Sequence, residues 1–473
     1  MKKLNDLYQG IGTDIVVRGI KNNIADVSNG DLFVFNIKQI PDYDYFDEAI
    51  KKGACAVVTN RSLRDSRIPV ITVPDASREY PYLCQKFYDF PDKKMQMIGI
   101  TGSNGKTSTS FILQSILGSD MAGYIGPNGR SCAAFSDTDK EAMNSYEIYS
   151  TLDEFSKFGC KYGIIEGNDK ALAKGELQSI DFDISVFTNL VNEYLDNNKF
   201  INYYNAIIAI LNKTKDTGYC VLNSDDSVFN AIKGLCKGKI VTYGRSADST
   251  LQIVDYKIND TKTVIKFKYG DEEFESTSSL LGVFNVYNLA ASILTALTLG
   301  YKIDNIVSKI GNIMVPGRMN FLNTDSTYYV LVDYAHTINT ISKVMEFVNT
   351  LDIGNKYIVF SSALDLDVDQ LNCIGRLLCE QASHVIFSYD DSNQDVVNNV
   401  SYILGTIKDS YSNYSFVEDR KDAINKAIEL AKDKDIVLIL GKGDKSYQSL
   451  GFNDTEVAYQ AIALKKIKES NSW

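Results

Sequence analysis

The stretch MQMIGITGSNGKTS at residues 95–108 decides the fold of this chain. Its apolar run, 95–100, predicts a buried strand, and residues 108–117 predict the helix that follows. Between them, Gly102 and Gly105 let backbone N–H groups close around phosphate oxygens, and the N-terminus of the helix adds positive potential. A strand, a glycine loop and a helix in this order predict a phosphate-binding loop in a parallel α/β domain.

Within this loop, Lys106 is expected to reach the terminal phosphates of a nucleotide, and the Thr107 hydroxyl to hold Mg²⁺. Asn104 and Ser108 complete the residues that we expect around the phosphates. The spacing departs from the general G-x-x-x-x-G-K-[ST] pattern, because Ile100 stands at the position of the first glycine. A plain glycine turn capped by Thr107 is the alternative, and the flanking strand and helix favour the nucleotide site.

Alternation of β and α patterns on both sides of the loop predicts three domains. Residues 1–93 are predicted to form a small α/β unit. Residues 94–314 hold the loop in a doubly wound parallel sheet, extended between 240 and 279 by a β-ribbon of period two. A Pro-Gly pair marks the second boundary, and residues 315–473 again alternate strands and helices. The last domain is therefore predicted to be a Rossmann-like, doubly wound α/β unit.

The composition narrows the class of partner. Lys and Arg total 49 and Asp and Glu total 60 in 473 residues, so the net charge of −11 argues against nucleic acid or an anionic membrane. No apolar run approaches the ~20 residues that span a bilayer, and no secretory signal follows Met1. The eight scattered cysteines favour reduced thiols in the cytoplasm. Two histidines are too few for a multi-histidine metal site.

The loop TGSNGKT resembles the phosphate loop of the Mur ligases, which build the peptide of bacterial peptidoglycan. Six further stretches resemble motifs of this family, above all those of the ligase that adds the third peptide residue (MurE). They follow the family's order along the whole chain: GDLFV at 30–34, FTNL at 187–190, GVFNVYN at 282–288, VPGRM at 315–319, VDYAHT at 332–337 and GKG at 441–443. Each match is short, and their common order carries the resemblance.

The resemblance implies a mechanism in which ATP phosphorylates a substrate carboxylate and an amine then attacks the acyl phosphate to form an amide. Lys106 would neutralise the transferring phosphoryl group, and Glu166 matches the family's Mg²⁺ ligand beside Thr107. Four more positions match nucleotide contacts of the family, namely Asn288, Arg318, Asp333 and His336.

Each of these residues also has a plainer interpretation. Glu166 would be a surface carboxylate at the end of a strand, and Asn288 a residue on a helix surface. Arg318 and Asp333 would form an interdomain salt bridge. His336 would cap a turn.

Two positions depart from the family's second Mg²⁺ site. Tyr194 stands where the family has a histidine, and Ile207 where it has a carbamylated lysine. Neither side chain is a good ligand for a hard cation, so we expect one Mg²⁺ site and the loss of the second. Lys170, four residues after Glu166, is a hypothetical replacement for the lost charge, and a solvated loop lysine is the alternative.

Positions that contact the peptidoglycan substrate in the family differ in this sequence as well. The family's D-S-R is Asn23-Ile24-Ala25, and an arginine after Glu166 is replaced by Glu176. This reversal of charge predicts poorer binding of the same anionic substrate. The D-N-P-R signature corresponds to Asp390-Asp391-Ser392-Asn393, and Lys445 replaces the glutamate of G-K-G-H-E.

Three functions therefore stay open. The first is an ATP-dependent ligase that joins an altered small-molecule carboxylate acceptor to an amino acid. The second is UDP-N-acetylmuramoyl-tripeptide synthetase with a divergent site. The third is a nucleotide-binding protein without catalysis, which the Tyr194 and Ile207 positions favour and the intact nucleotide motifs oppose. The sequence does not indicate an oligomeric state.

Overall fold

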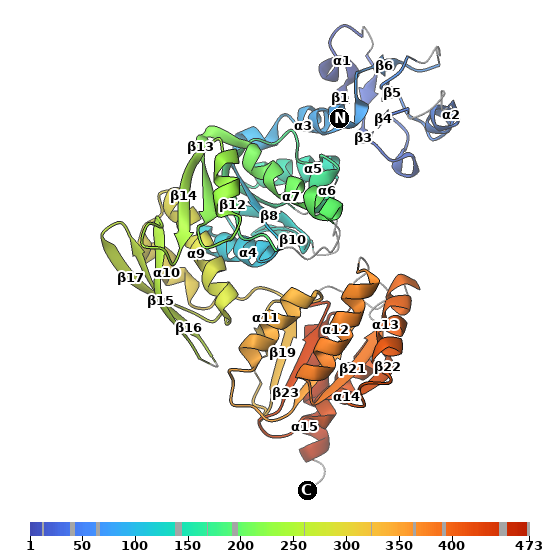
Figure 1. Cartoon of the computed structure of the whole chain (residues 1–473). Coiled ribbons are helices and arrows are strands. Elements are labelled where there is room, and N and C mark those ends of the chain that lie inside the picture. The colour runs from blue at the N-terminus through green and yellow to red at the C-terminus, as the bar shows by residue number, and fades with distance from the viewer. Residues whose placement is uncertain are drawn as a thin grey trace. The chain divides into compact units, whose positions relative to one another are not determined.

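The structure, a computed structural model, describes most of the chain (Figure 1); the described residues are 1–11, 14–37, 43–62, 67–137, 144–167, 169–191, 197–259, 261–322, 324–362, 366–389, 394–443 and 452–470. The chain forms two compact units, Met1–Thr242 and Tyr243–Trp473. The predicted domain bounds, 1–93, 94–314 and 315–473, stay predictions. No helix in the described ranges is long and apolar enough to cross a membrane.

The beginning of the first unit is a small α/β structure, as predicted. A two-stranded antiparallel sheet pairs β1 (Lys2–Lys3) with β2 (Val16–Val17). Beside it, four parallel strands follow the order β3 (Gly19–Lys21), β4 (Asp31–Phe35), β5 (Ala56–Thr59) and β6 (Val70–Thr72). The helical segments of this part are α1 (Leu4–Leu7), η1 (Ile24–Asp26), α2 (Tyr43–Lys51), α3 (Ala76–Phe87) and η2 (Pro91–Lys94).

The large sheet of the first unit has the order β10-β9-β8-β11-β7-β12-β13. Strands β8 to β13 in this order run parallel, and β9 and β10 add an antiparallel edge. The chain builds the β8 side of β7 (Gln96–Thr101) first and then the β12 side, so the direction of winding reverses at β7. Ligands of open α/β sheets bind beyond the carboxyl ends of strands at such a reversal.

The other strands of this sheet are β8 (Ala122–Gly126), β9 (Gly129–Cys132), β10 (Phe135–Asp137), β11 (Tyr162–Glu166), β12 (Phe182–Phe187) and β13 (Thr214–Asn223). Its helices are α4 (Lys106–Leu117), α5 (Ser145–Lys157), α6 (Asp169–Ala173), α7 (Asn197–Asn212), α8 (Phe229–Ile232) and η3 (Lys233–Leu235).

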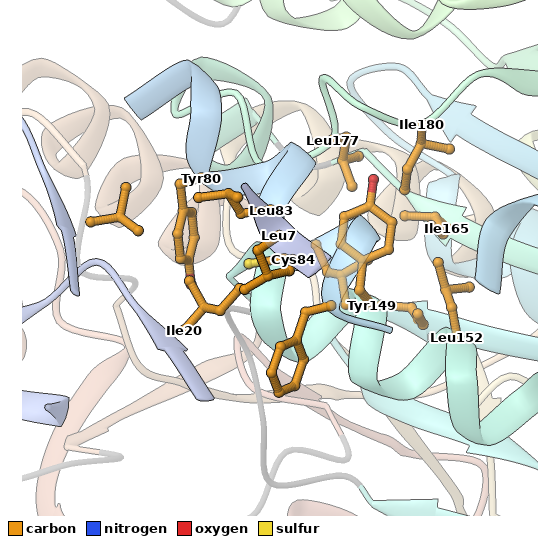
Figure 2. Packing of buried hydrophobic residues seen from close by; sticks show 14 of the residues in the cluster. Leu7, Ile20, Tyr80, Leu83, Cys84, Tyr149, Leu152, Ile165, Leu177 and Ile180 are labelled. Carbon is orange, nitrogen blue, oxygen red and sulfur yellow. The ribbon is translucent and has the colours of Figure 1, made fainter. Parts of the chain in front are cut away.

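One apolar core joins the beginning of the chain to this sheet. Leu7 and Ile20 share a buried cluster with Tyr80 of α3 and with Tyr149 and Leu152 of α5 (Figure 2). Burial of large apolar side chains contributes about 1.5–3 kcal/mol each, which makes this cluster a main source of stability for the unit.

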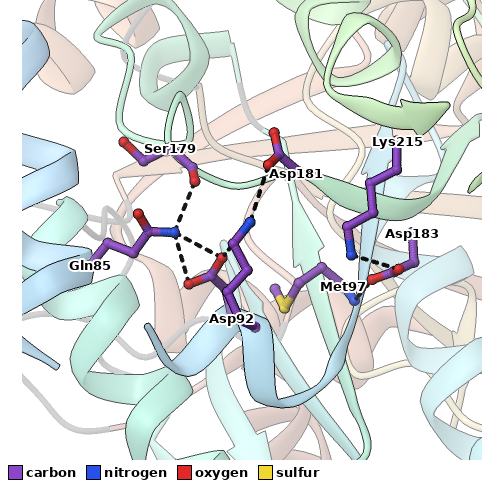
Figure 3. A network of polar contacts seen from close by, with 8 residues as sticks. Gln85, Asp92, Met97, Ser179, Asp181, Asp183 and Lys215 are labelled. Carbon is purple, nitrogen blue, oxygen red and sulfur yellow. Dashed lines mark hydrogen bonds and ion pairs between the residues drawn. The ribbon is translucent and has the colours of Figure 1, made fainter. Parts of the chain in front are cut away.

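Polar contacts also join α3 and η2 to the neighbourhood of β7 and β12 (Figure 3). The Gln85 amide nitrogen donates to both carboxylate oxygens of Asp92, at 2.9 and 3.0 Å, and to the carbonyl of Ser179 at 3.1 Å. Asp183 accepts from the backbone N–H of Met97 at 2.9 Å and from Lys215 Nζ at 2.7 Å. The segment around Asp92, which its composition marks as a polar break, is therefore packed, and the Asp92 side chain is buried.

The second unit begins with the predicted β-ribbon. Strand β14 (Lys239–Gly244) crosses from the first unit into the second and runs parallel to the start of β15 (Leu251–Ile258). Antiparallel pairing then joins β15 to β16 (Thr263–Tyr269) and β16 to β17 (Glu272–Ser278). Two helices follow, α9 (Val283–Thr298) and α10 (Ile303–Ile310).

The C-terminal sheet is a Rossmann-like, doubly wound sheet, as predicted. Five parallel strands form it, β19 (Tyr329–Asp333), β23 (Ile436–Leu440), β20 (Lys356–Phe360), β21 (His384–Tyr389) and β22 (Tyr414–Asp419). Strand β18 (Asn320–Phe321) pairs antiparallel with β19. One face packs on α11 (Ile338–Val348), α12 (Val368–Gln381) and α13 (Gln394–Ile407), and the other on α14 (Arg420–Leu430) and α15 (Asp454–Ser470).

Candidate nucleotide-binding site

The loop between β7 and α4 has the backbone of a phosphate-binding loop. Gly102 has φ +137°, and Gly105, at the N-cap of α4, has φ +86°. Residues that carry a side chain rarely adopt such backbone angles. A Cβ on Gly102 would also lie 2.1 Å from the Thr188 hydroxyl, so the loop tolerates only glycine there. The backbone thus turns from the buried strand into the helix within four residues.

Lys106, Thr107 and Ser108 form the first turn of α4, where the helix N-terminus favours an anion. Lys106 Nζ donates to the carbonyl oxygens of Gly102, at 2.6 Å, and Ser103, at 3.0 Å. Its ammonium group therefore lies over the loop. Thr107 and Ser108 are buried.

Glu166 ends β11, the parallel neighbour of β7, and its register partner is Ile100. One carboxylate oxygen accepts from the Thr107 hydroxyl at 3.0 Å, and the other accepts from the Tyr124 hydroxyl at 2.6 Å. Glu166 is 3% exposed, so the plainer interpretation of a surface carboxylate is wrong. A carboxylate and a hydroxyl in contact beside a phosphate loop supply the hard oxygen ligands that Mg²⁺ prefers, and the residues fit one such ion.

The second metal position has no comparable ligands among the described residues. Ile207 is buried in an apolar cluster with Phe187, Leu211 and Cys220, and the neighbouring Ile208 packs against the same cluster. Tyr194 and the side chain of Lys170 lie outside the described residues, so the hypothesis about Lys170 stays a prediction. The described parts of the chain contain no group of three or more His, Cys, Asp or Glu that could hold a metal ion.

In the second unit, the motifs around Arg318, Asp333 and Gly443 converge at the carboxyl ends of β19 and β23. A Cβ on Gly443 would lie 2.8 Å from the Gly317 carbonyl and 3.3 Å from Tyr334 Cβ. The Arg318 guanidinium lies over the Tyr334 ring, 4.3 Å from its centroid. These glycines therefore allow three loops to pack closely at one end of the sheet.

Asp333 is held by backbone donors in this region. Its carboxylate accepts from the N–H groups of Met319, at 2.6 Å, and Ala335, at 2.7 Å. Burial raises the pKa of Asp333, while the positive charge of Arg318 and the two N–H donors oppose that rise. The side chain is thereby fixed at the end of β19.

Asn288 and His336 have local partners. Asn288, on α9, is 4% exposed and donates to the Asn285 side chain at 3.0 Å, so it is not a residue of the helix surface. His336 Nδ1 lies 2.8 Å from the Tyr334 carbonyl, a contact within the turn before α11. A role for either residue at a nucleotide stays a prediction.

Comparison with known proteins decides the family. The Mur ligase middle domain matches residues 100–296, and the Mur ligase glutamate ligase domain matches residues 317–443. UDP-N-acetylmuramoyl-L-alanyl-D-glutamate–2,6-diaminopimelate ligase of Halalkalibacterium halodurans is 31% identical over 465 residues, which cover 94% of each chain. The chain belongs to the Mur ligase family. It is thus a MurE-like member of a family of ATP-dependent, ADP-forming ligases that make amide bonds.

Other relatives of this Mur ligase support the same family assignment. The diaminopimelate ligase of Fusobacterium nucleatum is 30% identical over 99% of this chain and 96% of its own. A solved diaminopimelate ligase shares the fold with a TM-score of 0.67 at 22% identity, covering 98% of this chain and 99% of that one. The MurF ligase of Thermotoga maritima, solved with ADP, has a TM-score of 0.62 at 18% identity, with 97% and 100% covered.

In this Mur ligase, Glu176 has a structural partner that its sequence did not indicate. It is 8% exposed, and its carboxylate accepts from the backbone N–H of Ser145 at 2.7 Å and from the Ser145 hydroxyl. Ser145 begins α5, so the carboxylate caps the N-terminus of that helix.

The remaining substrate positions are only partly described. Asn23 caps η1, because its side chain accepts from the N–H of Ala25 at 3.2 Å. The stretch 390–393 and Lys445 lie outside the described residues, so the expectations for them stay predictions.

Proposed function

We propose that this Mur ligase activates a small-molecule carboxylate with ATP and joins it to an amino acid, releasing ADP and phosphate. The observation that carries the proposal is the contact between Thr107 and Glu166 beside Lys106, since these residues match the family's phosphate and Mg²⁺ positions. We also propose that it works in the cytoplasm, in keeping with its eight free cysteines.

In the proposed reaction, some residues neutralise the charge of the phosphates and others hold the nucleotide in place. Lys106 neutralises the phosphoryl group as it passes to the carboxylate, and Arg318 suits bidentate recognition of phosphate oxygens. Thr107 and Glu166 hold one Mg²⁺, which screens the charge of the phosphates when bound. Asn288 lies beside the adenine of ATP, and Asp333 and His336 contact the nucleotide, as the resemblance implies. No protein nucleophile is needed, because the amine attacks an acyl phosphate.

The carboxylate acceptor is proposed to differ from that of the relatives. Asn23 replaces part of a substrate motif and caps η1, and Glu176 replaces an arginine and caps α5. An arginine that would bind an anionic acceptor is thus absent, and the carboxylate in its place is turned toward Ser145. Together with the changed residues 390–393, this supports a different acceptor and amine.

Two other functions make different predictions. The similarity to diaminopimelate ligases favours the addition of a diamino acid to UDP-N-acetylmuramoyl-L-alanyl-D-glutamate. The apolar surroundings of Ile207 favour a nucleotide-binding protein without catalysis, because they leave no ligand for a second metal at that position.

Phosphate release separates the three functions. The protein is incubated with ATP, Mg²⁺, pooled amino acids and a panel of carboxylates, with and without the UDP-linked dipeptide. Release that requires an acceptor other than the dipeptide supports the proposal, and release that requires the dipeptide supports the tripeptide synthetase. Nucleotide binding without release under any mixture would overturn the ligase. A Lys106→Met variant controls for contaminating ATPases.

A further inference from the structure

The phosphate loop is held in place by side chains from the end of β12, a different strand. The carbonyl oxygen of Asn104, in the middle of the loop, accepts from the Thr188 hydroxyl and from the Asn189 side-chain amide, both at 2.8 Å. The N–H of Asn104 donates in turn to Asn189 Oδ1 at 3.1 Å. Both backbone groups of one loop residue are therefore bound by two neighbours more than 80 positions along the chain.

Further contacts join the same two segments. The N–H of Ser103 donates to the Asn189 carbonyl at 2.7 Å, and the N–H of Val191 donates to the Ser103 hydroxyl at 2.8 Å. The close approach of Gly102 to Thr188 leaves no space for a side chain between them. The loop is thus docked against residues 188–191 along several consecutive positions.

The contacts on Asn104 have a consequence for the phosphate site. A trans peptide is planar, so its C=O and N–H groups point in opposite directions. Fixing the Asn104 carbonyl toward β12 therefore directs the N–H of Gly105 away from β12. It also keeps a carbonyl oxygen, which would repel phosphate, from rotating into the loop. Freed from these contacts, the peptide before a glycine would rotate easily.

A second layer of contacts, from the end of β13 and the turn that follows it, supports Thr188 and Leu190. Asn223 donates to the Thr188 carbonyl at 2.9 Å, and Asp226 accepts from the N–H of Leu190 at 3.0 Å. Thr188 is 3% exposed and Asn223 is 7% exposed. Buried hydrogen bonds of this kind hold one geometry, because breaking them leaves polar groups without water.

We propose that Thr188 and Asn189 are positioning residues for the nucleotide phosphates, acting through the Asn104 peptide without touching the nucleotide. The inference rests on the proposed binding of ATP at this loop. It assigns a purpose to the FTNL stretch, whose resemblance to the family's motif came without a role. It also predicts that loss of the hydrogen bonds to Asn104 weakens ATP binding and raises the KM for ATP more than it lowers kcat.

The test compares variants that differ by one polar group. Thr188→Val keeps the shape and removes the hydroxyl, and Thr188→Ser restores it. Thr214→Val is the matched control, because Thr214 is also buried and donates to the Ser185 hydroxyl at 2.7 Å, in the same sheet. Dissociation constants for ADP and for ATP are measured by calorimetry with and without Mg²⁺, and the melting temperature of each variant is recorded.

Thr188→Val is expected to weaken nucleotide binding about tenfold, and Thr188→Ser to bind like the wild type. Thr214→Val is expected to lower the melting temperature and leave the dissociation constants unchanged. Unchanged affinity in Thr188→Val, or equal weakening in Thr214→Val, overturns the positioning role alone. A wild-type protein that binds neither nucleotide overturns the proposed function as well.

Discussion

The Thr107 hydroxyl donates a 3.0 Å hydrogen bond to Glu166, which joins the first turn of α4 to the end of β11 across 59 residues of sequence. The pairing of β11 beside β7 creates this contact, since it sets Glu166 opposite Ile100, six residues before Lys106 on the strand that leads into the loop. The fold thereby brings a hydroxyl and a carboxylate together at the point where the sheet reverses its winding.

Lys106→Met should reduce ATP-dependent amide formation at least about 100-fold, because the variant loses the charge that neutralises the transferring phosphoryl group. Stability should change little, since the ammonium group bonds carbonyl oxygens of its own loop. ADP production and the melting temperature are the measurements. Lys157→Met, which removes an exposed ammonium group that pairs with Asp153, should keep full activity. Equal activity in both variants would exclude the role of Lys106.

Glu166→Gln should make nucleotide binding less dependent on Mg²⁺, because an amide is a weaker ligand for a hard cation than a carboxylate. Tyr124→Phe should have a smaller effect in the same direction, since it removes only the hydroxyl that orients Glu166. ADP affinity is titrated by calorimetry at several Mg²⁺ concentrations. An unchanged Mg²⁺ dependence in Glu166→Gln would show that the carboxylate does not hold the ion.

Much of the site near Lys106 could be predicted from sequence because it is local. Strand, glycines, lysine and threonine follow one another, and short-range geometry decides their arrangement. The hydrogen bonds from Thr188 and Asn189 to the loop could not be predicted from local sequence, because they depend on β12 lying beside β7. The FTNL stretch could be recognised in the sequence as a family motif. Only the order of the strands shows that it contacts the phosphate loop.

Burial explains the other differences between sequence and structure. Asp92 and Glu176 are charged residues that composition places at the surface or against a substrate, yet both are buried. The fold tolerates each buried carboxyl group because a hydrogen-bond donor lies beside it. The donor is Gln85 for Asp92 and Ser145 for Glu176. The partners are seven residues apart for Asp92 and 31 residues apart for Glu176, and neither spacing is a recognisable sequence pattern. The β-ribbon, by contrast, was predictable because period-two alternation is local.

Glu176→Ala should lower the free energy of unfolding by about 1–3 kcal/mol, because Ser145 and the N-terminus of α5 would lose a buried acceptor. Urea unfolding at neutral pH measures the change. Glu429→Ala is the control, since that carboxylate is 66% exposed and pairs only at the surface with Lys468. ADP affinity should be the same in both variants. A stable Glu176→Ala protein with altered substrate preference would instead place this carboxylate at the acceptor.

Arg420→Met should destabilise the second unit by about 3–5 kcal/mol, because it removes the guanidinium charge that compensates the buried carboxylate of Asp454. The two side chains are 2% and 0% exposed, and Arg420 donates to both carboxylate oxygens, at 2.9 and 2.7 Å. Asp352→Asn breaks an exposed pair with Lys434 and should leave stability nearly unchanged. Urea unfolding followed by circular dichroism compares them, and similar losses would contradict the prediction.

Asp92→Asn should change how stability depends on pH. Burial raises the pKa of Asp92 above its ordinary value of 3.8, although Gln85 and Lys93 oppose the rise. The folded state therefore holds the proton more tightly than the unfolded state. Its stabilising contribution is complete below pH 3.8 and is lost as pH rises through the raised pKa.

The quantity to measure is the free energy of unfolding of the wild type minus that of Asp92→Asn, from urea titrations between pH 4 and pH 8. Other carboxyl groups titrate in both proteins, and the subtraction removes their contribution. The difference should fall as pH rises and then level off, because asparagine does not titrate and a buried carboxylate costs free energy once ionised. A difference that rises with pH would mean that Gln85 and Lys93 outweigh burial, and that Asp92 is stabilised as a carboxylate in the folded protein.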